Sequence, residues 1–186
     1  MGLKVITPPT SEVVSVAEAK AHLRVTHTDE DAYIGVLISA AREQAEQLTE
    51  RAIGEQSLLL QLDAFPDEIL LQYPPIIAVD SLQYRDTDGD MQTIDPANYT
   101  LDTGLEPSWI LPAVDYEWPE TDESANALQV TYRAGYTDVN CPAAIKQWIL
   151  LKVGELYENR EASMERAVTS PSFVDHMLDR YRIWEV

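Results

Sequence analysis

Hydrophobic positions recur at three- and four-residue intervals in two stretches of the N-terminal region, which is the spacing of one helical face. The first stretch opens with Ser15-Val16-Ala17-Glu18, a capping-box pattern that satisfies free N–H groups at a helix start, and predicts a helix to Arg24. The second predicts a longer helix with Thr28 as N-cap and Gly54 as C-terminal stop. Its predicted buried stripe is Ile34, Leu37, Ile38, Ala41, Ala45 and Leu48.

Short apolar runs separated by Pro, Asp and Gly replace this helical spacing from Gln56 onward, and such runs are typical of β-strands. Asp88-Gly89 is the strongest hairpin signal in the chain. The acidic stretch 114–124 has the composition of a loop, and we expect it to be the least ordered part of the chain. The predicted strands cover residues 57–63, 69–72, 76–85, 91–94, 99–102, 108–111 and 127–133.

Helical spacing returns after Pro142, which suits the first position of a helix because its missing N–H is not needed there. Gly154 interrupts this helix and indicates a close neighbour, which could belong to the same chain or to another subunit. A final helix is predicted from Pro171. The apolar stripe of the Pro142 helix is Ile145, Trp148, Ile149, Val153, Leu156 and Tyr157, and that of the final helix is Phe173, Met177 and Tyr181.

Together these elements predict an α+β fold, in which the N-terminal helix pair and the C-terminal helices form a helical core and an antiparallel β subdomain is inserted between them. The length of 186 residues indicates a single domain. We expect residues 1–55 to hold an extended N-terminal arm (1–14) and the first helices, residues 56–136 the β-rich acidic insertion, and residues 137–186 the C-terminal helices and tail.

The formal charge of −19 is distributed unevenly and changes the functional picture. Residues 60–125 contain fifteen acids and one base, Arg85, whereas residues 142–186 contain seven acids and six bases. Binding to nucleic acid by counterion release needs Lys and Arg on the phosphates, so the charge disfavours that function. No apolar run of transmembrane length occurs, and the N-terminus lacks the apolar stretch of a secretory signal. We therefore expect the protein to be made in a cytoplasm and not to associate with a membrane.

Candidate metal and catalytic groups are sparse. Asp86, Asp88 and Asp90 have the alternation of a calcium loop, but Gly89 is misplaced and no glutamate closes the loop, so a hairpin turn is the better interpretation. The histidines His22, His27 and His176 lack the spacing of helical metal ligands, and the single Cys141 excludes an internal disulfide. We predict no catalytic residue, no metal and no cofactor; a hydrolase that uses a pair of carboxylates is the alternative from a different class.

The C-terminal tail carries Tyr, Arg and Trp, the residue types enriched at binding hot spots. A tail that ends in aromatic residues either folds back on its own core or binds a partner, and for Trp184 both alternatives stay open. The predicted partner-contact residues are Met177, Tyr181, Arg182, Ile183 and Trp184.

An ordered series of segments resembles the phage head–tail connector (adaptor) family, in particular the longer adaptors of prophages and gene transfer agents. The series covers nearly the whole chain: Leu3–Pro9, Val14–Val25, Asp31–Glu46, Pro74–Val79, Tyr132–Tyr136 and the helix from Cys141 to Glu161.

The resemblance implies a structural protein of the virion or phage-like particle that forms a ring, usually of twelve copies, between the portal and the tail. Its implied partners are further copies of itself, the portal, through the C-terminal helix and tail, and a stopper or tail-completion protein. DNA would pass through the channel without specific binding. Another neck component, a stopper or a tail terminator, is the alternative within the same class.

Overall fold

The computed structural model describes residues 2–104, 106–160 and 175–183. The chain divides into two compact units, each formed by segments that are distant in sequence. Residues 1–10 and 55–135 form one, called the sheet unit here, and residues 11–54 and 136–186 form the other, the helical unit. The predicted α+β class is confirmed, since both helices and antiparallel sheets are present.

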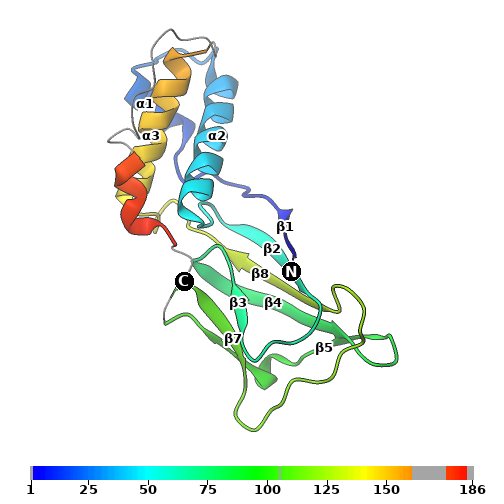
Figure 1. Cartoon of the computed structure of the whole chain (residues 1–186). Coiled ribbons are helices and arrows are strands. Elements are labelled where there is room, and N and C mark those ends of the chain that lie inside the picture. The colour runs from blue at the N-terminus through cyan, green and yellow to red at the C-terminus, as the bar shows by residue number, and fades with distance from the viewer. Residues whose placement is uncertain (1, 105, 161–174, 184–186) are drawn as a thin grey trace, which may run out of the picture. The chain divides into compact units, whose positions relative to one another are not determined.

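The described residues of the helical unit form three α-helices, which pack side by side in Figure 1, and a short 3-10 helix. Its elements are α1 (Val16–Leu23), α2 (Asp31–Thr49), α3 (Ala143–Glu158) and η2 (Asp175–Tyr181). The start predicted for the last helix, Pro171, lies outside the described residues.

Local capping agrees with the sequence at α1 and differs at α2. The Ser15 hydroxyl and the Glu18 carboxylate form the predicted capping box, which lowers the pKa of Glu18. Thr28 is wrong as the N-cap of α2, because Glu30 occupies that position and makes no side-chain capping bond. Gly54 is also wrong as the stop, because the helix ends at Thr49 and its C-cap is Glu50, which adopts the left-handed conformation with φ 55°.

One hydrophobic cluster joins α1, α2, α3 and η2. Trp148 and Ile149 of α3 and Ile34 of α2 are fully buried in it, together with Leu178 of η2. Gly154 faces α1: a Cβ at this position would lie 3.7 Å from His22 Nε2 and 3.9 Å from Leu23 Cδ2. The close neighbour that this glycine indicated is therefore a helix of the same chain.

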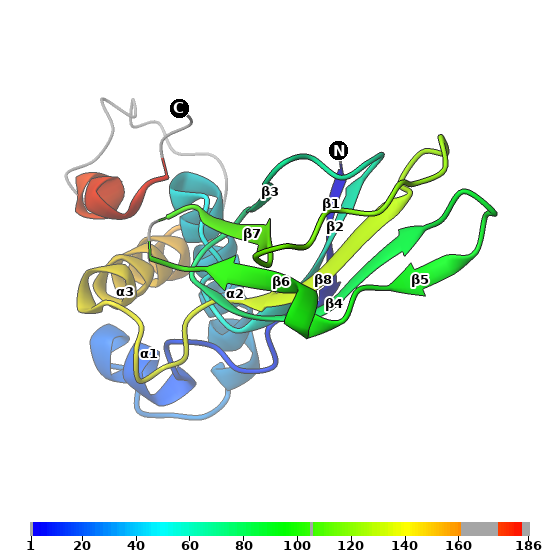
Figure 2. The same ribbon diagram turned by 90° about the horizontal axis from the view of Figure 1, so that it is seen from below.

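The sheet unit contains two antiparallel sheets, whose strands are visible in Figure 2. The five-stranded sheet has the order β1-β2-β8-β4-β5, and the three-stranded sheet has the order β3-β7-β6. The strands are β1 (Gly2–Thr7), β2 (Gln56–Leu62), β3 (Ile69–Leu71), β4 (Ile76–Arg85), β5 (Met91–Thr93), β6 (Tyr99–Asp102), β7 (Ser108–Pro112) and β8 (Leu128–Ala134).

Alternating side chains of the central strands make the core of this unit. Leu58 and Leu60 of β2 and Leu128 and Val130 of β8 are buried, while the residues between them are partly exposed. Tyr132, also on β8, is buried and its hydroxyl donates to the Gln72 carbonyl after β3 at 2.9 Å. This bond links the two sheets, and burial raises the pKa of the Tyr132 hydroxyl.

The N-terminal arm and the acidic loop both hold more structure than the sequence predicted. The arm forms strand β1, which pairs with β2 in the register Leu3–Leu60. The acidic loop is held by stacked rings: Phe65 and Trp118 lie 4.8 Å apart at an interplanar angle of 10°. The expectation that this loop is the least ordered part was wrong, because composition did not reveal that its aromatic residues find partners in another loop.

Candidate assembly surfaces

The predicted partner-contact segment is fastened to its own helical unit as far as Ile183. The Ile183 N–H donates to the Thr49 carbonyl at 3.0 Å, and the Tyr181 carbonyl accepts from Arg51 Nε. Met177 and Tyr181 are partly buried against the helical core, beside the fully buried Leu178. Four of the five predicted residues therefore lie on one short segment, and the fifth, Trp184, is outside the described residues.

The outward side of this segment carries charge. Arg182 Nε lies 3.3 Å from Asp179 Oδ1, and His176 Nδ1 lies 2.9 Å from Asp179 Oδ2. Arg180 is exposed. A partner that binds this segment would contact charged groups on η2. The apolar side chains predicted to make the contact are partly covered, so they are only partly accessible.

A network of ion pairs around Arg42 is largely buried within the helical unit. The Arg42 side chain is 7% exposed and contacts three carboxylates: Glu12 at 2.9 Å, Glu46 at 2.8 Å and Glu43 at 3.4 Å. The Ile53 N–H donates to Glu46 at 2.6 Å. Burial raises the pKa of Glu46 to about 7, even though Arg42 opposes this shift. Because the network joins α2 to segments on either side of it, we assign it to stability.

A second polar cluster joins the start of α2 to the end of α3. The guanidinium of Arg160 lies 4.9 Å from the ring centre of Tyr33 and 4.7 Å from that of Tyr157, which are cation–π distances. Glu30 accepts from the Tyr157 hydroxyl and, at 2.6 Å, from Arg160. Both bonds, the one from Tyr157 first, lower the pKa of Glu30, and the bond to Glu30 raises the pKa of Tyr157. The cluster ties two helix ends together on the surface.

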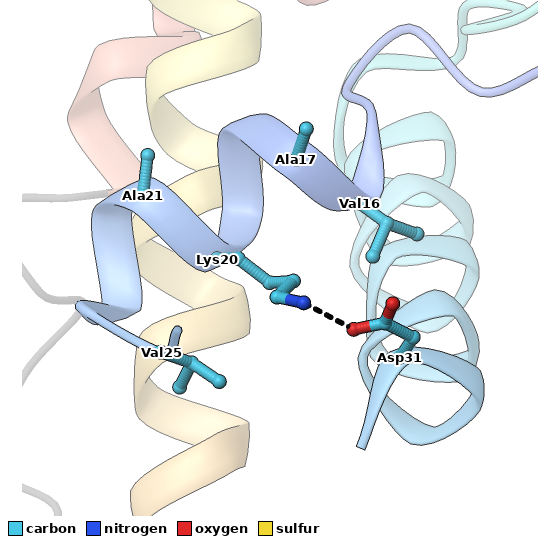
Figure 3. A pocket seen from close by; sticks show the side chains of 6 residues that line it. All are labelled: Val16, Ala17, Lys20, Ala21, Val25 and Asp31. Atoms are coloured by element: carbon cyan, nitrogen blue, oxygen red, sulfur yellow. Dashed lines mark hydrogen bonds and ion pairs between the residues drawn. The ribbon is translucent and has the colours of Figure 1, made fainter. Parts of the chain in front are cut away.

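A shallow depression of about 390 Å³ lies on the helical unit beside α1 (Figure 3). Its apolar lining comes from Val16, Ala17, Ala21 and Val25. Lys20 Nζ and Asp31 Oδ1 form an ion pair of 2.6 Å within it, as the dashed line in Figure 3 shows. The two charged groups that line the depression are thus paired with each other, which leaves no free charge there to orient a ligand.

The aspartates that resemble a calcium loop form the turn between β4 and β5. Asp86 Oδ1 accepts from the backbone N–H of Asp88 at 3.1 Å and of Asp90 at 2.9 Å, and Oδ2 accepts from Gln92 at 2.8 Å. These bonds, the one from Gln92 first, lower the pKa of Asp86. The carboxylate oxygens are engaged in holding the predicted hairpin, whose Gly89 has φ 90°.

The remaining reactive side chains are dispersed. Cys141 is buried, and burial raises the pKa of its thiol to about 11. His27 lies 3.7 Å from Glu30. Within residues 2–104, 106–160 and 175–183, no group of three or more His, Cys, Asp or Glu side chains is placed to hold a metal ion. In the same ranges, each helix is too short or too polar to cross a bilayer.

Exposed apolar side chains on β1 are a feature that the sequence reasoning missed. Val5 and Ile6 are 56% and 51% exposed, although they belong to a strand. The signal was present in the β-branched run Val5-Ile6-Thr7, which favours a strand. Pro8-Pro9, which follow it, favour an extended arm, so the composition of the segment did not predict pairing with β2.

Comparison with protein families locates a relationship in the first half of the chain. Residues 13–92 match the model of the phage gp6-like head-tail connector protein family. The family resemblance inferred from the sequence is confirmed over this segment. The matched region includes α1, α2 and the strands from β2 to the beginning of β5.

Solved structures extend the likeness to the full chain. A chain from the neck of an empty gene transfer agent (GTA) particle, computed with C6 symmetry, aligns with a TM-score of 0.82 and 22% identity. A chain from the virion of a native GTA particle gives 0.82 and 23%, and one from the neck of a native GTA particle, computed with C12 symmetry, gives 0.78 and 23%. Each alignment covers 100% of this chain and 97% of the other. At this identity the likeness shows a shared fold. No curated protein matches the chain.

Proposed function

We propose that this protein is a head–tail connector, a structural subunit of the neck of a phage or a phage-like particle such as a gene transfer agent. The observation that carries the proposal is the full-length fold likeness to GTA neck chains, with a TM-score of 0.82 over 100% of the chain. The match of residues 13–92 to the head-tail connector family supports it independently, because that comparison depends on sequence.

The proposed assembly is a ring, which we expect to hold twelve copies. The neck structures that resemble this chain were computed with C6 and C12 symmetry, as expected for a closed ring of identical subunits. The proposed partners are other copies of the chain, the portal protein, and a stopper or tail-completion protein. The ring would extend the DNA channel between the head and the tail.

The charge of the sheet unit supports a role beside DNA without binding to it. This unit contains sixteen acidic and three basic residues, a formal charge of −13. Carboxylates repel phosphates, so a channel wall or outer surface of this composition would not retain DNA. We expect these acids to face either the channel or solvent, because burying unpaired charges between subunits is costly.

The alternatives have less support. A stopper or tail terminator would be a different ring of the same neck, whereas the matched family is that of head-tail connectors. A carboxylate-dependent hydrolase would need two acids held at a set distance in a cleft, whereas Asp115 and Glu117, with Tyr116, line a wide and open depression of the sheet unit. We propose that the chain is not an enzyme.

Electron microscopy of the purified protein mixed with its cognate portal tests the proposal. We expect a ring docked coaxially on the portal, with density for the added subunits absent from portal alone. The matched control is the same mixture with a portal from an unrelated particle. If particles purified from the producing strain lack this polypeptide at the neck, the proposal is wrong.

The predicted portal contact needs a more conservative variant than removal of the whole tail. Deletion of residues 181–186 would also remove the Tyr181 carbonyl and the Ile183 N–H that bind the helical unit. A truncation after Ile183, which removes Trp184, leaves both bonds in place. We expect this truncated protein to fold normally and to bind the portal at least tenfold more weakly, about the effect of losing one hot-spot side chain. Unchanged binding would show that Trp184 is not a portal contact.

A further inference from the structure

Strand β1 is an edge strand with little cover on either side. It pairs on one edge with β2 and lies at the end of the five-stranded order, so its other edge offers unpaired backbone groups. Its last four residues, from Lys4 to Thr7, are all exposed. In an edge strand over a packed core, alternate residues are normally buried. Val5 and Ile6 are consecutive, and each leaves about half of its apolar surface exposed.

The charge of this strand differs from that of the rest of the protein. Residues 2–10 include one base, Lys4, and no acid, in a chain of net charge −19. A lysine and a β-bulge are two devices that keep edge strands from pairing indiscriminately. Both are present here, because the pairing register shifts between Val5 and Thr7. Lys4 and the bulge would keep this edge unpaired in the free subunit. Lys4 would also favour a partner surface that carries carboxylates.

Another copy of the same chain meets that requirement. Each copy has sixteen carboxylates on its sheet unit, whose formal charge is −13, so the unit as a whole attracts Lys4 of a neighbouring copy. A ring with rotational symmetry needs two different complementary surfaces on every subunit. The edge of β1, with Val5, Ile6 and the positive charge of Lys4, would be one of these surfaces. The acidic surface of the neighbouring sheet unit would be the other.

We propose that β1 binds the neighbouring copy in the assembled ring, with its free edge and the side chains of Val5 and Ile6 against that copy and Lys4 near its carboxylates. This inference rests on the proposed function, since it needs a ring. It adds the surface that joins subunits, which is separate from the C-terminal segment predicted to bind the portal.

Cross-linking of isotope-labelled mixtures identifies directly which molecule contacts β1 in the assembled ring. Rings are assembled on portal from equal amounts of ¹⁴N- and ¹⁵N-labelled protein and treated with a zero-length carbodiimide, which joins amines to carboxylates. We expect Lys4 peptides cross-linked to acidic peptides of the opposite isotope label, which proves contact between copies. Lys4 cross-links confined to one label, or formed only with portal peptides, would overturn the proposal. If no ring forms with unmodified protein, the proposed function fails instead, and the two failures are distinguishable.

Point variants provide an independent test. V5D and K4E each place a negative charge on the edge, and we expect each to reduce ring formation on the portal by about tenfold or more through like-charge repulsion. K4R retains the charge and should assemble normally. The matched control is V114D, which makes the same change at a valine of the same unit that is 92% exposed. Circular dichroism should show that every variant with reduced ring formation is still folded. Equally reduced ring formation in V114D, or normal ring formation in V5D, would contradict the role of β1.

Discussion

The helical and sheet units place charge in opposite ways. The helical unit has sixteen acids and ten bases, a formal charge of −6. Several of these groups form part-buried ion pairs, one between α1 and α2 and others around Arg42 of α2. The sheet unit has only three bases for its sixteen acids, so most of its carboxylates lack a cation of their own unit. Ion pairs therefore contribute to the cohesion of the helical unit, whereas the sheet unit carries a large excess of negative charge.

The largest expected effect comes from breaking the buried network of the helical unit. R42A leaves the carboxylates of Glu12 and Glu46 without their shared cation, and we expect a loss of about 3–5 kcal/mol in the free energy of unfolding, measured with urea. The control is R133A in the sheet unit, which removes two ion pairs of 3.1 Å from a half-exposed side chain. Its expected cost is much smaller, because ion pairs on exposed side chains contribute little to stability. Equal costs would contradict the contrast between the units.

A pH dependence sharpens the same contrast. Because burial raises the folded-state pKa of Glu46 to about 7, above its unfolded value of 4.5, the folded state favours the protonated carboxyl. This contribution is fully present below the unfolded pKa and is lost as pH rises through the folded one. Between about pH 5.5 and about pH 8 we expect the wild type to lose about 2 kcal/mol relative to E46Q. Parallel profiles for the two proteins would show that Glu46 does not titrate in this range.

Removing the aromatic contact that holds the acidic loop should lower the free energy of unfolding by a smaller amount. W118A removes the ring stacked on Phe65 and the bond from Trp118 Nε1 to the Asp67 carbonyl, 3.4 Å long. We expect a loss of about 1.5 kcal/mol. Hydrogen exchange should accelerate in residues 113–124 and stay unchanged in α2 and α3. Faster exchange in both units would show that the loop is not an independent feature of the sheet unit.

The smallest effect is a gain of stability at Gly154. A Cβ there would meet its nearest atom, His22 Nε2, at 3.7 Å, an ordinary contact distance. G154A should therefore raise the free energy of unfolding by about 1 kcal/mol, the helix-propensity difference between the two residues. G35A in α2 is the matched variant, because nothing lies within 4 Å of its Cβ position. Destabilisation by G154A alone would show that α1 and α3 pack more tightly than the structure indicates.

Local patterns accounted for most of the fold. The capping box at Ser15 and the hairpin at Asp88-Gly89 are interactions between residues at most a few positions apart, and both are present as predicted. The candidate surfaces were harder to predict. Met177 and Tyr181 have the residue types of a binding site, but both pack against the helical core. Arg51 and Thr49, about 130 residues away, bind the backbone of Tyr181 and Ile183 in the same segment.

By itself, the sequence determined the types of the elements, the uneven charge and the resemblance to head–tail connectors. Periodicity, capping and composition act over a few residues and so can be recognised without a structure. Only the tertiary structure decided that the N-terminal arm is an edge strand on β2, that Arg42 gathers carboxylates from separate segments, and that Phe65 holds the acidic loop through Trp118. These contacts join residues far apart in the chain, and which ones meet depends on how the whole backbone pairs and packs.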